Sequence, residues 1–345
     1  MFGQLPERSF YYPFDFPDSL ELLWNKSTTG SFSNNSVVIE GSFVFTSDLA
    51  GNIFCFDTNE GKVIGADKGK GEIAVSPILN YGIMFYIITV PNKPHSLLIS
   101  YDIRKGERLK EIEIEGRVGN EMNKLHDSFV FVTDNGVVYK YDYLMQKIWE
   151  HDIKSKVTSS PAATGDRLYL VTFAGEFVCI SLEKGSVIYK ESLNSNFESA
   201  LVVTDKYGFI GDENGTLFAV NLIDGSIKWK AEMNTKIKAP PVHNNEIIYS
   251  ANLGGSVYAF DIENGENMWT YFSDGLFNAP AALFNNILIQ PDVNRKLIFL
   301  NPFTGELLKT MEFDSRVKMH PTFFNNILYI GIDRGELFAY KLIFD

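Results

Sequence analysis

The sequence predicts an all-β protein, an eight-bladed β-propeller in which each blade is a four-stranded antiparallel sheet. Three observations lead to this prediction. A segment of about 40 residues recurs eight times, each copy holds about four short strands, and no stretch of the chain has helical periodicity. Repeats of this length and content are typical of propellers, although an open β-solenoid would share the pattern.

The clearest strand of each repeat usually begins with glycine, as in residues 215–221 (Gly-Thr-Leu-Phe-Ala-Val-Asn) and 255–261 (Gly-Ser-Val-Tyr-Ala-Phe-Asp). Apolar residues alternate with others there, and β-branched and aromatic residues are enriched, which is the pattern of a strand. The copies begin at residues 51, 96, 136, 175, 215, 255, 295 and 335, so successive copies lie 39 to 45 residues apart. A spacing this regular does not arise by chance.

Turns separate this strand from its neighbours in the repeat. Asn264-Gly265 predicts a tight hairpin, because such turns need positive φ, and a further strand follows, often with an aromatic residue. Another hairpin precedes each glycine-led strand, with an Asn-rich turn such as Asn244-Asn245. A proline such as Pro240 marks its entry, where a strand loses no ladder hydrogen bond. Each repeat therefore contains about four strands.

The two ends of the sequence favour a closed ring over a solenoid. The last copy reaches Asp345 directly after its third strand, and the strand that it lacks is found at the other end of the chain. Residues 20–26, which contain Trp24, match residues 226–231, which contain Trp229. We expect residues 20–26 to complete the last blade beside residues 336–344, which removes the free sheet edges. Residues 1–17 then form an N-terminal extension and residues 18–345 a single propeller domain.

The pattern Tyr258-Ala-Phe-Asp261, Gly265 and Trp269 resembles the pyrroloquinoline-quinone-type repeat of the BamB-like β-propeller family. The resemblance covers about residues 18–345 and weakens in blades 2 and 7, where Lys110 and Lys309 take the tryptophan position. It implies that the tryptophans of the outer strands dock between blades: Trp24, Trp149, Trp229 and Trp269.

The same resemblance implies a function. The BamB-like propellers are expected to be non-catalytic protein–protein interaction scaffolds of the bacterial cell envelope, with envelope or outer-membrane proteins as partners. The fold also serves quinoprotein dehydrogenases, so a cofactor-binding enzyme is one alternative, and a ligand-binding or structural module of a surface assembly is another. Quinoprotein dehydrogenases are longer and typically carry adjacent cysteines and a calcium site, and this sequence has no Cys-Cys pair.

Composition narrows the partners. The 345 residues carry a formal net charge of −12, so general binding to nucleic acid or to anionic membranes is not expected. The longest apolar run, about residues 82–90, is far shorter than the roughly 20 residues of a transmembrane helix. The N-terminus lacks a basic region followed by an apolar stretch, so we expect no export signal in this sequence. A location in the periplasm or envelope would require that a signal had been removed.

Chemical motifs point away from catalysis. The five histidines show no close zinc-ligand spacing, and no nucleophile or phosphate-binding motif is present. We therefore expect no catalytic, cofactor-binding or metal-ligating residues and no cofactor. Cys55 and Cys179 occupy the same repeat position in blades 1 and 4, so we expect two free thiols, each in a small buried slot, too far apart for a disulfide.

One set of basic residues is a candidate binding site. Seven residues after each tryptophan position the chain turns from an outer strand into the next blade, and four of these eight positions are basic. In a closed ring they would surround one mouth of the central channel and bind a carboxylate or an acidic loop of a partner. The alternative is surface charge balanced by acids on neighbouring loops. The four residues are Arg117, Lys156, Lys236 and Arg316.

Overall fold

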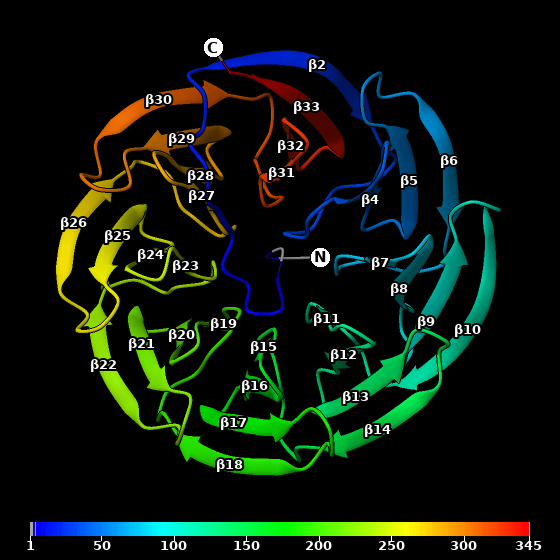
Figure 1. Ribbon diagram of the computed structural model, residues 1–345, viewed down its shortest axis with the longest axis horizontal. Coiled ribbons are helices and arrows are strands. Elements are labelled where there is room, and N and C mark those ends of the chain that lie inside the picture. The colour runs from blue at the N-terminus through cyan, green and yellow to red at the C-terminus, as the bar shows by residue number, and fades with distance from the viewer. Residues whose placement is uncertain (1–2, 4, 345) are drawn as a thin grey trace.

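A computed structural model describes residues 3 and 5–344. Eight antiparallel sheets stand around a central axis, and no helix occurs among these residues (Figure 1). The predicted eight-bladed propeller is confirmed. Each blade has its shortest strand at the channel and its most exposed strand at the rim.

The first four blades are described by their strands from channel to rim. Blade 1 contains β3 (Val38–Glu40), β4 (Phe43–Ser47), β5 (Asn52–Asp57) and β6 (Val63–Lys68), and blade 2 contains β7 (Ile78–Asn80), β8 (Ile83–Thr89), β9 (His95–Asp102) and β10 (Glu107–Glu115). Blade 3 contains β11 (Asn123–Lys124), β12 (Ser128–Val132), β13 (Val137–Asp142) and β14 (Lys147–Asp152), and blade 4 contains β15 (Ala162–Thr164), β16 (Arg167–Val171), β17 (Glu176–Ser181) and β18 (Val187–Ser192).

The remaining four blades follow the same order. Blade 5 contains β19 (Val202–Val203), β20 (Tyr207–Gly211), β21 (Thr216–Asn221) and β22 (Ile227–Glu232), and blade 6 contains β23 (Val242–His243), β24 (Ile247–Ala251), β25 (Ser256–Asp261) and β26 (Asn267–Phe272). Blade 7 contains β27 (Ala282–Phe284), β28 (Leu288–Asp292), β29 (Lys296–Leu300) and β30 (Leu307–Glu312), and blade 8 contains β31 (Thr322–Phe324), β32 (Ile327–Ile332), β33 (Glu336–Ile343) and β2 (Ser19–Ser27).

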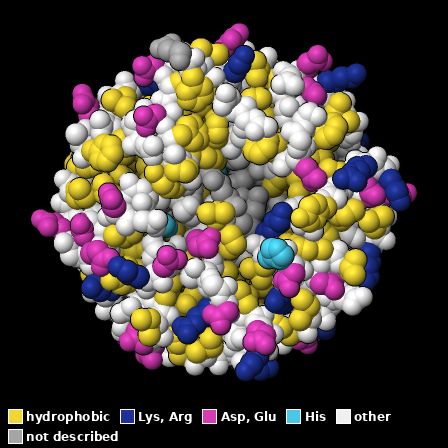
Figure 2. Space-filling model, in the orientation of Figure 1, with side chains coloured by type: hydrophobic (Ala, Val, Ile, Leu, Met, Phe, Trp, Pro, Cys, Tyr) yellow, Lys and Arg dark blue, Asp and Glu magenta, His cyan; other side chains and the backbone are white. Residues whose placement is uncertain are grey.

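The core lies between blades rather than inside one of them. The two middle strands of each blade bury both faces, which explains their nearly continuous apolar residues. One cluster joins Phe209 and Trp229 of blade 5 to Ile248 and Phe260 of blade 6. Outer strands such as β22 bury only alternate side chains and leave the others at the rim. Acidic and basic side chains are interspersed over the face seen in Figure 2.

The ring closes as the sequence predicts. Strand β2 pairs antiparallel with β33, so that Leu20 lies opposite Leu342 and Lys26 opposite Leu337. The amide of Asn25 also donates to Glu336 across a sequence separation of 311 residues. The N-terminal and C-terminal parts of the chain therefore share one sheet, in which β2 covers the edge of β33 that would otherwise be free.

The N-terminal extension contains a short strand that joins one of the blades. A two-residue strand, β1 (Tyr11–Tyr12), pairs parallel with the innermost strand of blade 7 and makes that sheet five-stranded. The pairing is possible because β27 is a free inner edge that faces the channel.

No helix in the described part of the chain is long and apolar enough to cross a membrane.

Cys55 and Cys179 are both free, as predicted. Cys179 is fully buried and faces Tyr189 of its outer strand. Cys55 is only half-buried, which differs from the expected buried slot. The reason is local, because the residue opposite Cys55 is Gly65, which has no side chain to cover it.

Candidate functional site

The central channel has two mouths, which we name by the loops around them. The turn face carries the turns between the first and second strands of each blade, such as residues 204–206 and 244–246. The entry face carries the loops that lead from an outer strand to the innermost strand of the next blade, such as residues 193–201. The four basic candidates lie on loops of the entry face.

The chain's own N-terminal segment, residues 5–18, lies across the turn-face mouth. Figure 1 shows it running from the centre of the ring past β27 to β2 at the rim. Its carbonyls accept hydrogen bonds from the inner strands of four successive blades, at 3.0, 3.0, 3.3 and 3.0 Å. The pairs are Ala163 with Pro6, Val203 with Glu7, His243 with Ser9, and Leu283 with Phe10. The segment therefore satisfies backbone donors that would otherwise face the channel.

Aromatic side chains fix this segment in place. Phe10, Tyr12 and Phe16 are buried. The ring of Tyr12 stacks on Phe284 of blade 7 with centroids 4.8 Å apart, and the amide of Phe16 donates to the side-chain oxygen of Asn286 at 2.7 Å. The extension is therefore part of the hydrophobic core, not a tail.

Arg8 lies fully buried near the axis and links the segment to two blades. Its Nε donates to the Pro161 carbonyl at 2.7 Å, and Nη2 donates to the carbonyl of Glu121 at 3.0 Å and to Oδ1 of Asn123 at 3.2 Å. Burial lowers the pKa of Arg8 to about 10, with the Glu121 charge opposing that change. A buried cation of this kind needs such partners.

Glu121 supplies the negative charge that acts on the pKa of Arg8. Its carboxylate accepts hydrogen bonds from the amide of Ser76 at 2.8 Å and from the Ser76 hydroxyl at 3.2 Å. Burial raises the pKa of Glu121 to about 7, and the charge of Arg8 and the Ser76 donors oppose the rise. Blades 2, 3 and 4 thus meet the N-terminal segment through one buried polar network.

The entry-face mouth remains open as a small cavity. Its volume is about 150 Å³, and Glu121 is among the residues that line it. Glu198 and Lys238 also line it, together with amide side chains from three blades. Asn34 of blade 1 spans part of the opening, because its Nδ2 donates to the carbonyl of Asn278, 244 residues away, at 2.8 Å.

The structure places the four basic candidates on the entry face and gives each a neighbour. Arg117 lies 3.8 Å from Glu72, and Arg316 lies 3.1 Å from Asp333. Lys236 is held by two carboxylates, those of Glu198 and Glu213, both at 2.8 Å. The ammonium of Lys156 lies 4.9 Å from the centre of the Phe173 ring. Acids on neighbouring loops thus balance part of this charge, and the role of the ring in binding stays a prediction.

Electrostatic coupling also joins two of these residues. Burial raises the pKa of Asp134, and the charges of Arg117 and Lys156 act in the opposite direction. Arg117 is 47% exposed and Arg316 is 59% exposed, whereas Lys236 is 29% exposed. Lys156 is exposed as well, so Arg117, Lys156 and Arg316 are all better placed than Lys236 to contact another molecule.

The four tryptophans lie at the junctions between blades. Each indole N–H donates to a backbone carbonyl of the next blade, and each ring covers the glycine of a turn there. For Trp229 the acceptor is the Ile262 carbonyl at 3.1 Å and the glycine is Gly265. The other three pairs are Trp24 with Thr58 at 3.0 Å, Trp149 with Leu182 at 3.0 Å, and Trp269 with Pro302 at 2.9 Å.

Sequence reasoning missed the N-terminal segment as part of the channel. A signal was present, because five of the seven residues from Phe10 to Phe16 are aromatic, a composition that a solvated tail does not have. The isolated Arg8 just before them gave no such indication. Among residues 3 and 5–344, no group of three or more His, Cys, Asp or Glu side chains is arranged to hold a metal ion.

One known protein family matches the middle of the chain. The profile of the family described as "Outer membrane protein assembly factor BamB" matches residues 134–235 and 202–276. BamB from Moraxella catarrhalis superposes with a TM-score of 0.79 at 14% identity, over 94% of this chain and 100% of that one. No match was found among curated protein sequences.

Enzymes of the same fold match equally well in structure. A quinohemoprotein alcohol dehydrogenase from Pseudomonas putida has a TM-score of 0.82 at 10% identity, over 99% of this chain and 79% of that one. A europium-containing methanol dehydrogenase has a TM-score of 0.82 at 9% identity, over 99% and 97%. At these identities the similarity shows the fold and not the activity.

The residues of the channel fit pyrroloquinoline quinone poorly. This cofactor is a planar tricarboxylate, and the entry-face cavity of about 150 Å³ is smaller than the roughly 300–1,000 Å³ of typical ligand sites. The carboxylates of Glu121 and Glu198 line it beside Lys238, so the cavity does not offer the positive field that a trianion needs. The opposite mouth is covered by the N-terminal segment, and the cavity of about 350 Å³ beside this segment is lined, among the described residues, by Glu7 and Asp205 and by no lysine or arginine.

Proposed function

Because this chain is an eight-bladed β-propeller of pyrroloquinoline-quinone-type repeats, we propose that it is a non-catalytic scaffold that binds other proteins of the bacterial cell envelope. The similarity to BamB, whose family is described as an outer-membrane assembly factor, supports this choice of partner class.

The observation that carries the proposal is the N-terminal segment across the turn-face mouth. In a propeller the channel is the natural place for a small ligand. Here the chain itself fills one end of it with buried side chains, of which Arg8 and Phe10 are fully buried. The broad surfaces left for recognition are the loops of the two faces, and such surfaces suit a protein partner.

We place the partner on the entry face, near Arg117 and Lys156. These two residues come from neighbouring loops, and neither is held by two acids as Lys236 is. A partner with an acidic loop would gain charge-assisted hydrogen bonds there and would associate faster at low salt.

The test is an affinity column that carries the protein as it exists. Envelope extract is passed over wild-type protein and over the Arg117→Glu/Lys156→Glu variant, and retained proteins are identified by mass spectrometry. We expect one defined envelope protein on the wild-type column and at least a tenfold loss on the variant, since the change reverses two charges. Thermal unfolding should change little, because exposed charges contribute little to folding.

The control is Lys62→Glu/Lys184→Glu, which makes the same charge change on exposed turns of the turn face. Equal retention by wild type and entry-face variant would refute the placement of the partner.

Calorimetric titration with pyrroloquinoline quinone and calcium addresses the enzyme alternative. Stoichiometric binding, followed by alcohol oxidation with an artificial electron acceptor, would overturn the scaffold proposal.

A further inference from the structure

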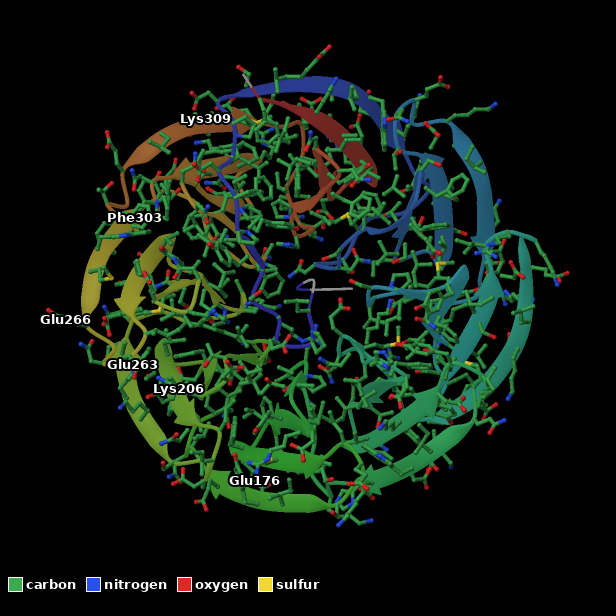
Figure 3. The ribbon with its side chains drawn as sticks, in the orientation of Figure 1. Glu176, Lys206, Glu263, Glu266, Phe303 and Lys309 are labelled. Atoms are coloured by element: carbon green, nitrogen blue, oxygen red, sulfur yellow. The ribbon has the colours of Figure 1, made fainter. Side chains whose placement is uncertain are left out.

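Each outer strand has one position, occupied by tryptophan in four blades, whose side chain packs at the junction with the next blade. We call it the docking position, and in seven blades a long side chain fills it. It is tryptophan in four of them and tyrosine in blade 4, where the Tyr189 hydroxyl donates to the Leu222 carbonyl at 2.7 Å. In blade 2, Lys110 reaches the Met145 carbonyl at 2.9 Å. In blade 7 the residue is Lys309, which Figure 3 labels. Its ammonium lies 4.8 Å from the centre of the Phe299 ring.

Blade 1 has Gly65 at this position. The strand register shows the equivalence, because Gly65 lies opposite Cys55 just as Trp269 lies opposite Ala259 and Trp229 opposite Ala219. The junction between blades 1 and 2 therefore lacks the side chain that fills the other junctions.

A cavity of about 210 Å³ occupies this junction. The residues around it match those around a docked tryptophan. Gly106 corresponds to Gly61, which Trp24 covers, and the Ile103 carbonyl corresponds to the Thr58 carbonyl that accepts from its indole. The rest of the lining combines apolar and aromatic side chains with charged ones. The first group includes Phe45, Ile53, Cys55, Ile64, Met84 and Tyr101, and the charged residues are Asp67, Arg104 and Lys105.

There is room for a side chain at residue 65, and the backbone conformation there does not require glycine. A β-carbon built on Gly65 would meet no atom within 4 Å, and Gly65 is not among the glycines with positive φ. At the four tryptophan junctions, a β-carbon on the turn glycine would lie only 2.5 to 2.6 Å from the indole. On Gly106 the nearest atom would be the Tyr101 hydroxyl, at 3.7 Å.

We propose that this junction is a binding site for a small planar aromatic molecule of indole size with one N–H donor. The walls supply apolar contact, and the Ile103 carbonyl takes the place that accepts the ring N–H elsewhere in this chain. An apolar cavity of about 150 Å³ holds benzene, so a cavity of 210 Å³ has room for an indole ring. The ligand completes the junction as the tryptophan of another blade does.

The experiment titrates the whole protein with indole by calorimetry. We expect saturable binding with one indole per chain. Gly65→Trp should weaken binding at least tenfold and raise the melting temperature, because the new side chain fills the slot from within. Val63→Trp is the matched control, since it adds the same residue to the same strand at a side chain that is 54% exposed and outside the cavity. Unchanged indole binding by Gly65→Trp would overturn the proposal.

A second measurement needs no variant. Cys55 lines the cavity, and burial raises its pKa to about 11, so its alkylation is slow and easily followed by mass spectrometry. Indole should slow alkylation of Cys55 several-fold, whereas cyclohexanol, which is similar in size but not planar, should not. Equal protection by both compounds would refute an aromatic site. Binding of a tryptophan-containing peptide without binding of free indole would also overturn the claim, since the ligand would then be a partner's side chain.

Discussion

Arg8 illustrates how one residue can hold several elements together. It comes from the N-terminal segment, yet its guanidinium donates hydrogen bonds to blades 3 and 4, more than 100 residues away in sequence. A buried guanidinium is costly unless every donor is satisfied. Its presence therefore depends on Glu121, Asn123 and the Pro161 carbonyl being in place at the same time.

Arg8→Met should lower the free energy of unfolding by about 3–5 kcal/mol, because it leaves the Glu121 carboxylate buried without its counter-charge. The double variant Arg8→Met/Glu121→Gln should lose less than the single variant. Urea denaturation at pH 7.5 measures both. Additive losses from the two substitutions would contradict the coupling of this pair.

The buried imidazole of His243, on the turn face, should make the stability of the protein fall at acidic pH. Burial lowers its pKa to about 4, below the roughly 6.5 of an exposed histidine. The folded state therefore favours neutral His243, which stabilises the protein above pH 6.5, and this stabilisation is lost as the pH falls from 6.5 towards 4. Glu121 acts in the opposite sense, since its raised pKa makes folding less favourable as the pH rises from about 4.5 to 7.

His243→Leu isolates the histidine contribution. Between pH 7.5 and pH 5, wild type should lose about 2 kcal/mol of stability relative to this variant. Urea midpoints at the two pH values provide the measurement, with His126→Gln on another turn of the same face as the control. Parallel pH profiles for wild type and His243→Leu would show that the buried imidazole titrates normally.

At the scale of elements, outer strands differ in how firmly they are held. Strand β22 buries Trp229 and Ala231, whereas β6 has no fully buried side chain. At the docking position β6 has Gly65 and so makes no side-chain contact with blade 2 there, although Asp67 of the same strand pairs with Arg108 of blade 2. Local stability therefore varies around a ring that looks regular in Figure 1.

Hydrogen exchange should reveal this difference. Backbone amides of β6 should exchange at least tenfold faster than those of β22, and saturating indole should slow exchange in β6 alone. Mass spectrometry of peptic fragments measures both strands in one sample. Equal exchange rates in the two strands would mean that docking residues contribute little to holding the rim.

Two truncations separate the functions of the N-terminal residues. Deletion of residues 1–16 removes the segment over the turn-face mouth and keeps β2, so a monomeric ring with a lower melting temperature is expected. Deletion of residues 1–26 also removes the partner of β33 and should cause aggregation through the exposed edge. Gel filtration and thermal unfolding compare them. Identical behaviour would show that β2 does not close the ring.

At the scale of the whole molecule, the regular repeat made the architecture predictable. The 40-residue period gave the number of blades, and the match of Trp24 to Trp229 gave the closing strand, because both depend on local patterns that recur. The N-terminal segment could not be placed in this way, since its backbone hydrogen bonds reach four blades, Arg8 reaches a fifth, and no repeat unit encodes these contacts.

The candidate sites were less predictable than the fold. The position of Arg117, Lys156, Lys236 and Arg316 on one face followed from the spacing, but their neighbours did not. Glu198 and Glu213 reach Lys236 from two different loops, so only the three-dimensional arrangement shows that its charge is balanced. The junction at Gly65 is likewise defined by the space that the residues around it leave unfilled.

The pairing of β2 with β33 has a consequence for how the protein is made. Residue 25 leaves the ribosome 311 residues before residue 336, with which it shares a hydrogen bond. At about 5–20 residues per second, translation keeps β2 waiting on the order of 15–60 s. During that time Leu20 and Trp24 are exposed on a nascent chain and are open to a holding chaperone or to the wrong partner. A circular permutant that encodes residues 19–27 after residue 343 would remove this delay.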